Sequence, residues 1–413
     1  MAPNLPRLDF RGTDGATLPG AGRVLREPER YWPPAILDRP FVEGRTGRRR
    51  LILIAEPETV ARILNNQGGT FPRARLHDRM LGATYGENLL RGDQADWRRQ
   101  RGDLLRPFRD GVETSRSGMA LACERILLEW DAVPQGAPLD VIRDARRFTL
   151  DSLWRSFFGA GGAADVEPKV EATALALDEQ DQAALAKHLQ ILQPLADLAH
   201  SHAPSWIEPG ETLDLNTMLL FLHAGHDNVA AALAWALWLL AVHPDIQARV
   251  RAEWRAGSTP ESEGHPLLEA VICETLRLYP PIMHLIRDVE ADVEISGQIL
   301  PRGFTAVLSL YAMHRNRNWW NEPDRFQPDR FLAGMSAARR RSVWLPFGTG
   351  PRGCIGSTFA RAEMVQFLGS AIDRFELLPG PDAPMTCRVN FVLRPQGRGA
   401  VSLRPASTNS TGA

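Results

Sequence analysis

Apolar residues recur at helical spacing over most of the chain, whereas only short stretches alternate between apolar and polar positions. Helices are predicted over much of 96–206, over 214–242 and over 266–279, where two prolines prevent continuation. Alternation predicts short strands within 48–55, 293–310 and 388–404. The pattern therefore predicts a mainly α-helical protein with small β-sheets.

Local signals refine three of these elements. Residues 48–66 predict a strand, a turn at Glu56 and Pro57, and a helix that begins near Thr59. Helix also returns after Gly356, at the end of a glycine-rich loop. The longest apolar run, 229–242, is too short to span a bilayer, so we expect a buried core helix there.

No long linker rich in glycine, serine or proline divides the 413 residues. We therefore expect a single domain over residues 1–404. The tail at 405–413 has a composition typical of disordered segments.

The net charge and the N-terminal sequence limit the partners and the cellular location that we expect for the protein. The 48 lysines and arginines nearly balance the 49 aspartates and glutamates, for a formal net charge of -1. This balance argues against nucleic acid or a membrane surface as the partner of the whole protein. No basic segment followed by an apolar one is present at the start, so neither a signal peptide nor an N-terminal anchor is predicted. We expect a cytoplasmic protein.

The four cysteines lie far apart and form no Cys-x-x-Cys pair, which argues against a zinc site, an iron–sulfur cluster or a disulfide framework. One of them, Cys354, stands between glycine-rich turns in the segment WLPFGTGPRGCIGSTFARAE. A thiolate there could bind a metal, attack a carbonyl or fill the core. Four glycines without side chains favour the approach of something large and flat, and the following helix would direct free N–H groups toward the sulfur.

The segment FGTGPRGCIG at 347–356 resembles the heme-binding loop of the cytochrome P450 family, and it contains every fixed position of that loop. The resemblance implies the family's largely helical fold around one heme b (iron protoporphyrin IX), and it is closest in kind to the soluble bacterial members. It implies that Cys354 is the proximal iron ligand, that Phe347 packs beside the thiolate and that Arg352 pairs with a heme propionate. Gly350 and Gly356 belong to the same cofactor-binding loop.

Further motifs in the family's order support this resemblance. Glu274 and Arg277 in CETLRLYPP share one helical face and resemble the family's buried Glu-x-x-Arg pair, to which FQPDRF adds Arg330. We interpret this network as structural. Trp97 and Arg101 resemble the pair beside a heme propionate, and a third propionate partner is expected at Arg287.

The long helix departs from the family pattern. In FLHAGHDNVAA, Ala224 and Gly225 match the helix that crosses the oxygen-binding face, and a mid-helix glycine suits close approach of a ligand. An acid followed by threonine is usual next, but this chain has Asp227 followed by Asn228. The usual hydroxyl helps to deliver protons during oxygen activation. An amide can still donate a hydrogen bond and hold a water, so we expect Asp227 and Asn228 to manage protons and water.

Other candidate residues near this site carry weaker signals. His223 and His226 share a helix face, but no third ligand is evident and a metal site is not favoured. We place His284, Phe221 and Phe391 in the wall of a substrate pocket, with core packing as the alternative for each.

The resemblance implies an oxidoreductase, which we interpret as a monooxygenase. It would use dioxygen to oxidise a small or medium apolar metabolite, such as one of secondary metabolism. Since the chain has no flavin or iron–sulfur segment, electrons would come from a separate ferredoxin or flavodoxin and its reductase. A docking face for that partner could use the basic residues Arg98, Arg99, Arg106, Arg109, Arg339, Arg340 and Arg341.

Two other classes of function remain open at this stage. Asn228 in place of threonine motivates non-oxygenating heme-thiolate chemistry: nitrene transfer or cyclisation, dehydration, peroxide rearrangement or oxidative coupling. A heme-based binding or sensor protein would carry the same ligand loop, but no attached signalling segment favours it.

Overall fold

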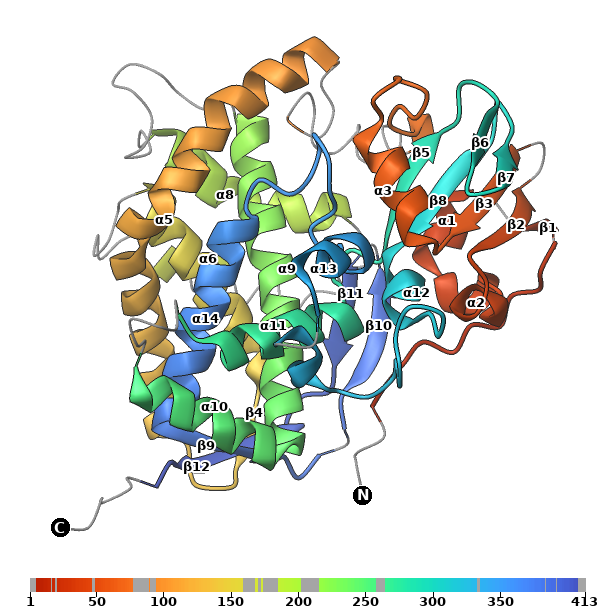
Figure 1. Cartoon of the computed structure of the whole chain (residues 1–413). Helices are drawn as coiled ribbons and strands as arrows, with labels where there is room; N and C mark the ends of the chain where they lie inside the picture. Colours follow the sequence, from red (N-terminus) through yellow and green to blue (C-terminus); the bar gives the residue numbers. More distant parts are fainter. Residues whose placement is uncertain are drawn as a thin grey trace.

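Helix α9 (Leu215–Val242) runs through the middle of the helical part of the molecule (Figure 1). It packs against α6, α8, α10, α11 and α14, and its residues 229–241 are buried. Asn216–Val242 is long and apolar enough to cross a membrane, but 83% of its most apolar window is buried inside the protein. The apolar run at 229–242 is therefore a core helix, as its sequence predicts.

The structure is a computed structural model. It describes residues 5–15, 17–18, 21–46, 49–76, 89, 94–158, 168–169, 172–173, 185–201, 215–257, 264–332, 335–382, 384–390 and 392–407.

The helices surround α9 on most sides (Figure 1). The other helices in the described ranges are α1 (Ala21–Arg26), α2 (Pro28–Tyr31), α3 (Pro57–Asn65), α5 (Gln94–Asp131), α6 (Val141–Phe158), α8 (Leu185–Ser201), α10 (Pro244–Ala256), α11 (Pro266–Leu278), α12 (Leu310–Arg315), α13 (Ala337–Val343) and α14 (Ser357–Arg374), with short 3-10 helices η1 (Pro34–Leu37) and η2 (Pro328–Phe331).

The strands of the described residues form four small sheets, the largest at one side of the molecule (Figure 1). That sheet has the order β1-β2-β3-β8-β5, from β1 (Thr17–Leu18), β2 (Phe41–Thr46), β3 (Arg49–Ile54), β8 (Thr305–Ser309) and β5 (His284–Asp288). The others are β4-β12-β9, from β4 (Pro138–Leu139), β12 (Val401–Pro405) and β9 (Phe375–Pro379); β6-β7, from β6 (Val293–Ile295) and β7 (Gln298–Leu300); and β10-β11, from β10 (Thr386–Asn390) and β11 (Val392–Gln396).

These elements confirm the predicted fold class, and most predicted boundaries lie within a few residues of the observed ones. Helix α3 begins two residues earlier than expected, at Pro57. The Glu56 carboxylate accepts hydrogen bonds from the backbone N–H groups of Glu58 (3.1 Å) and Thr59 (2.5 Å), so it caps the helix. Proline at the first helical position needs no such partner, because it has no N–H.

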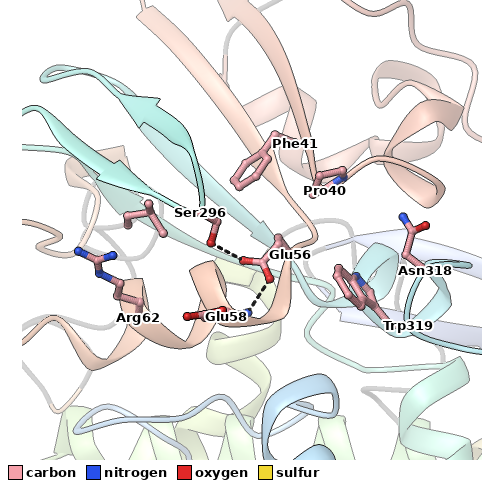
Figure 2. A pocket seen from close by; sticks show the side chains of 9 residues that line it. Pro40, Phe41, Glu56, Glu58, Arg62, Ser296, Asn318 and Trp319 are labelled. Carbon is pink, nitrogen blue, oxygen red and sulfur yellow. Dashed lines mark hydrogen bonds between the residues drawn. The ribbon is translucent and has the colours of Figure 1, made fainter.

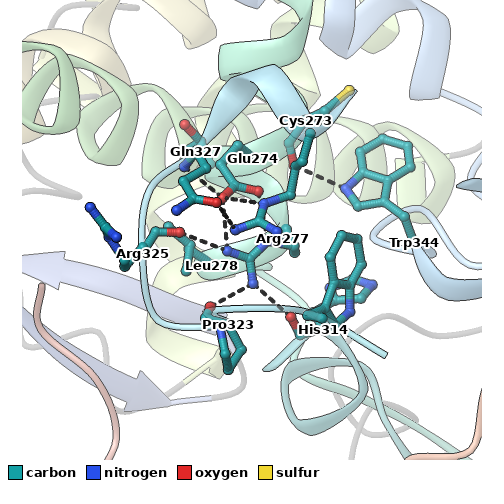
Figure 3. Close-up of polar contacts among 12 residues, drawn as sticks. Cys273, Glu274, Arg277, Leu278, His314, Pro323, Arg325, Gln327 and Trp344 are labelled. Carbon is teal, nitrogen blue, oxygen red and sulfur yellow. Dashed lines mark hydrogen bonds and ion pairs between the residues drawn. The ribbon is translucent and has the colours of Figure 1, made fainter. Parts of the chain in front are cut away.

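A buried ion network ties α11 to α12 and to the segment that follows α12 (Figure 3). The Arg277 guanidinium donates to both oxygens of Glu274, Nε to Oε2 at 2.6 Å and Nη2 to Oε1 at 2.8 Å, and both side chains are 0% exposed. The same guanidinium donates to the backbone carbonyls of His314 (2.8 Å), Pro323 (2.7 Å) and Arg325 (3.1 Å). Arg277 therefore uses its whole fork of donors on one carboxylate and three carbonyls.

The network also reaches the third predicted member. Glu274 Oε1 accepts hydrogen bonds from Arg330 Nε (3.0 Å) and from the backbone N–H of Gln327 (2.9 Å). These contacts connect α11 with η2 and its approach, as expected from the Glu-x-x-Arg motif. Because every charged atom of the Glu274 and Arg277 pair has a partner, the cost of burying the charges is offset.

We expect Glu274→Gln to lower the free energy of unfolding by about 3–5 kcal/mol, because it leaves the Arg277 charge buried without a counter-charge. Urea denaturation of the purified protein measures this. Arg325→Ala is the matched control: it removes an exposed ion pair with Glu322, keeps the backbone carbonyl that Arg277 uses, and should cost about 1 kcal/mol or less. Equal losses in the two variants would contradict the structural role of the network.

Candidate heme site

A cavity of about 330 Å³ lies where α9, α14 and the glycine-rich loop meet. Its wall is almost entirely apolar. Phe108 of α5, Leu153 of α6, Leu276 of α11 and Leu285 of β5 contribute to it, together with Phe359 near the start of α14. The loop itself contributes residues 346–349, 352 and 354–356, so the predicted iron ligand and the long helix face the same space.

The loop holds its shape through glycines that no other residue replaces easily. Gly348 and Gly350 have φ values of +67° and +73°, in the region that favours glycine. A Cβ on Gly350 would also lie 2.7 Å from the Leu64 carbonyl oxygen and 2.9 Å from Asn65 Oδ1. The loop therefore sits directly against the C-terminal end of α3.

Cys354 presents its sulfur to the cavity. Its backbone N–H donates to the Phe347 carbonyl (2.9 Å), which closes the loop. Its side chain lines the cavity and has solvent-accessible surface, although protein encloses the cavity around it. Burial raises the pKa of the Cys354 thiol, while the backbone N–H of Gly356 and the charge of Arg101 act in the opposite direction. The N–H donor expected at the helix start is therefore present, and a bound metal ion would stabilise the thiolate further.

Three predicted cofactor residues lie together beside the loop. The Arg352 guanidinium stacks over the Trp97 ring at 4.3 Å, and the Arg101 guanidinium lies 5.8 Å from the same ring. Arg101 also donates to the Gly353 carbonyl (2.8 Å). Trp97 is buried, and burial lowers the pKa of Arg101. Two cations close to the sulfur-bearing loop would suit an anionic group at the edge of the cavity.

Arg287 supplies the most direct test of fit for a heme. It lies on the same face of β5 as Leu285, which lines the cavity, and it is buried. Burial lowers the pKa of Arg287 to about 10, and the described residues offer it a backbone carbonyl, that of Ile286 (2.8 Å), but no carboxylate. A buried guanidinium without a counter-charge fits a propionate. The thiol, the apolar cavity and the three arginines together fit heme b.

The prediction that His284 lines this cavity is wrong. Adjacent residues of a strand point to opposite faces, so Leu285 takes the cavity side of β5. The His284 ring instead packs edge-on against Trp32, with ring centroids 5.5 Å apart. Burial lowers the pKa of His284 to about 4, so the ring is neutral at pH 7.

Two other residues, Phe221 and Phe391, were predicted to line the pocket, and the structure describes one of them. Phe221 lines the cavity and packs against Phe108, with ring centroids 5.0 Å apart. Phe391 lies outside the described residues.

On α9, the structure separates the residues that the sequence grouped. Ala224, Gly225 and Asn228 line the cavity. A Cβ on Gly225 would lie 2.9 Å from Leu153 Cδ1. The missing side chain at Gly225 therefore leaves room for Leu153 of α6, and not only for a ligand in the cavity.

Asp227 does not line the cavity, contrary to the role in proton management expected for it. The carboxylate is 1% exposed and pairs with the Arg394 guanidinium of β11, Nη2 to Oδ2 at 2.5 Å and Nε to Oδ1 at 3.2 Å. Arg146 of α6 lies 4.0 Å away on the same carboxylate. Successive residues of a helix point about 100° apart, so Asp227 faces Arg394 whereas Asn228 faces the cavity.

The two helix histidines do not assemble a metal site in the described part of the chain, where no group of three metal-ligating side chains occurs. Their ring centroids are 6.4 Å apart. His226 hydrogen-bonds through Nδ1 to the Leu222 carbonyl, and burial lowers the pKa of His223 to about 3.

A second cavity, of about 380 Å³, lies at the N-terminal end of α3 (Figure 2). It is lined by Glu56 and Arg62 of the α3 region, Ser296 and Trp319 among others. The Glu56 carboxylate accepts a hydrogen bond from the Ser296 hydroxyl (3.2 Å) besides its two capping bonds, so its polar atoms are used within the fold. We therefore assign the candidate site to the cavity at Cys354.

Among the described residues that line this cavity, the one carboxyl group, Glu363 of α14, was not predicted from the sequence. It lies four residues after Phe359 and four before Phe367, which are both buried, so a carboxyl group stands within an apolar helical face. This interruption of the apolar pattern was the available signal.

A cysteine ligand under an apolar cavity, with buried arginines at its edge and a helical fold around α9, defines a heme-thiolate protein. Comparison with known proteins agrees. Residues 211–401 match the profile of the family Cytochrome P450. The structure of a 6-coordinated cytochrome P450 from Thermus thermophilus is 30% identical over 94% of this chain and 98% of that one, with a TM-score of 0.68.

Other relatives extend the likeness. Cyclooctat-9-en-7-ol 5-monooxygenase from Streptomyces melanosporofaciens is 27% identical over 90% of both chains. Cytochrome P450 4F5 from Rattus norvegicus is 26% identical over 87% of this chain and 81% of the relative. The chain belongs to the cytochrome P450 family of heme-thiolate enzymes, and its cofactor is heme b.

We expect Arg287→Met to accelerate heme loss about 10- to 100-fold, because a charge-assisted hydrogen bond to a propionate contributes about 1.5–3 kcal/mol. Transfer of heme to an acceptor apoprotein, followed by absorbance, measures the rate. Arg302→Met, at an exposed turn, is the control and should leave the rate unchanged. An unchanged rate in Arg287→Met would show that this guanidinium does not hold the cofactor.

Proposed function

We propose that residues 1–404 form one heme-thiolate domain that works in the cytoplasm as a monooxygenase. It inserts an oxygen atom from dioxygen into a small or medium apolar metabolite, one of secondary metabolism. The observation that carries this proposal is the apolar cavity directly over Cys354, lined by side chains such as Phe108, Leu153 and Phe221. An apolar wall binds an apolar substrate by excluding water.

Each part of the site has a distinct task in this proposal. Cys354 holds the iron, and Trp97, Arg101, Arg287 and Arg352 hold the propionate edge. When bound, heme supplies the redox chemistry, and its thiolate ligand favours cleavage of the bond in dioxygen. The backbone N–H of Gly356 donates a hydrogen bond to the sulfur and so reduces the negative charge that the thiolate carries.

Asn228 takes the position of the usual hydroxyl with different chemistry. Its Nδ2 donates to the Ala224 carbonyl one turn earlier (3.0 Å), which leaves the second amide hydrogen for another partner. Its Oδ1 is buried and has no hydrogen-bond partner among the described residues. An ordered water beside Asn228 would satisfy this oxygen, so Asn228 holds water in the cavity wall rather than donating a proton itself.

Electrons come from a separate ferredoxin or flavodoxin and its reductase. Among the candidate docking residues, Arg98, Arg99, Arg339 and Arg341 are exposed, which supports an electrostatic surface. Arg340 instead stacks on Trp344, 5.0 Å from the ring. The side chains of Arg106 and Arg109 lie outside the described part of the structure.

The second candidate is a heme-thiolate reaction without oxygen insertion, namely nitrene transfer or cyclisation, dehydration, peroxide rearrangement or oxidative coupling. The absence of a hydroxyl at Asn228 favours it, because the amide is bound to its own helix and does not ionise. Asp227, paired with Arg394, does not replace the missing group at the cavity.

Growth of the native host under isotopically heavy dioxygen distinguishes the two candidates. We expect wild type, but not Cys354→Ala, to make a metabolite that carries one heavy oxygen atom, detected by mass spectrometry. A Cys354-dependent metabolite without the label would contradict monooxygenation and favour the second candidate.

We expect Asn228→Thr to leave the absorption spectrum of the bound heme intact, since neither residue holds the cofactor. The hydroxyl should raise the share of electrons recovered in product, and lower the hydrogen peroxide released, by a factor of about 2 to 10, which is less than the roughly 100-fold or more that a positioned proton donor contributes to a rate. Product and peroxide are measured per electron donor consumed. Unchanged yields would show that Asn228 has no part in handling water or protons.

A further inference from the structure

The first described residues of the chain, 5–12, form a strap that contacts α11 and α12. The strap belongs to no helix or strand, yet three of its side chains are buried in the hydrophobic core, those of Leu5, Leu8 and Phe10. At its end, the Gly12 N–H donates to the Trp32 carbonyl (2.9 Å). The strap is therefore a fixed part of the fold, although no regular ladder of hydrogen bonds holds it.

Two tyrosine hydroxyl groups hold the middle of the strap. Tyr279 Oη donates to the Pro6 carbonyl (3.0 Å), and Tyr311 Oη accepts a hydrogen bond from the Leu8 N–H (3.0 Å). Tyr279 is 0% exposed and Tyr311 is 1% exposed. Phenylalanine would fill either position without the cost of burying a hydroxyl group. The two hydroxyl groups therefore indicate that the position of the strap matters.

An ion pair extends this hold to the outer side of the strap. The Asp324 carboxylate accepts hydrogen bonds from Arg7 Nη1 through Oδ2 (3.1 Å) and from Arg315 Nη1 through Oδ1 (2.6 Å). Arg315 is buried, lies over the Tyr311 ring at 4.9 Å and donates to the Leu278 carbonyl (3.0 Å). One buried cation thus connects the strap with both α11 and α12.

Tyr279 connects the strap with the wall of the cofactor cavity. It follows Leu276, which lines the cavity, by three residues. Its ring stacks on Trp235 of α9, with centroids 3.9 Å apart and planes at 6°. Trp235 in turn follows Ala232, another residue of the cavity wall, by three residues. The strap is therefore held against residues that lie one helical turn from the cavity on both α9 and α11.

Tyr311 connects the strap with the loop that carries Cys354. Three residues after Tyr311 on α12, the His314 Nε2 accepts a hydrogen bond from the Leu345 N–H (2.9 Å), just before the loop. Burial lowers the pKa of His314 to about 3, so the ring is neutral and can accept this bond. A shift of α12 would therefore move a contact that positions the loop.

We propose that docking of the strap and retention of heme are coupled: the docked strap keeps the cofactor site closed, and bound heme keeps the strap docked. The coupling concerns the cofactor and does not depend on the reaction that the heme performs. Because coupling between two sites is reciprocal, undocking the strap weakens heme binding by the same factor by which loss of heme weakens docking. A segment that only adds apolar contacts to the core would show no such coupling.

Limited digestion of the full-length protein with trypsin measures docking of the strap. Cleavage between Arg7 and Leu8 requires the strap to leave Tyr311, so its rate follows the population of undocked strap. Cleavage after Arg302, at an exposed turn, is the reference for general loosening of the fold. We expect the ratio of the two rates to rise at least about fivefold when heme is extracted, the lower end of typical coupling. An unchanged ratio would overturn the proposal.

Conservative variants of the holoenzyme test the reverse direction. Tyr311→Phe and Tyr279→Phe each remove one hydrogen bond to the strap and keep the ring. We expect each to speed both the cleavage after Arg7, relative to Arg302, and the transfer of heme to an acceptor apoprotein about 2- to 10-fold. Asp9→Asn, which weakens an exposed ion pair within the strap, is the control and should change neither rate. Faster cleavage without faster heme transfer in both tyrosine variants would overturn the coupling.

Discussion

The buried pair of Glu274 and Arg277 is the constraint on which the cofactor loop depends. Arg277 holds the carbonyl of His314, and the neutral His314 ring accepts a hydrogen bond from the Leu345 N–H (2.9 Å) two residues before Phe347. Trp344 donates to the carbonyl of Cys273, next to Glu274 (2.9 Å). The start of the loop is thus held at two residues, Trp344 and Leu345, and both connect to the segments that carry the ion network. The Glu274 and Arg277 side chains therefore help to position the loop that carries Cys354, although they belong to a different helix.

From that fixed start, the site is completed by contacts that require small or apolar groups. Gly350 lets the loop rest on the end of α3, and Gly225 lets Leu153 of α6 reach α9. Both are contacts between segments far apart in sequence. The cavity is consequently shaped by several helices at once, and its few polar side chains are conspicuous because most of the other side chains of its wall are apolar.

The fold class and the cofactor loop could be predicted from the sequence because both depend on local patterns, such as the apolar run of α9 and the glycines around Cys354. The directions of single side chains could not. His284 faces Trp32 because strand pairing places Leu285 at the cavity, and Asp227 meets an arginine 167 residues later in the chain. Glu363 was visible only as one charge in an apolar helical face.

The ion pair between Asp227 and Arg394 joins the helix over the cofactor to strand β11 near the C-terminal end of the chain. Either residue alone would be a nearly buried charge with a lost partner, at a cost of several kcal/mol. Exchange of gene segments between relatives would therefore be tolerated best when both positions are inherited from the same parent. The two sites are expected to vary together during evolution, although one belongs to the central helix and the other to a hairpin that recombination could readily replace.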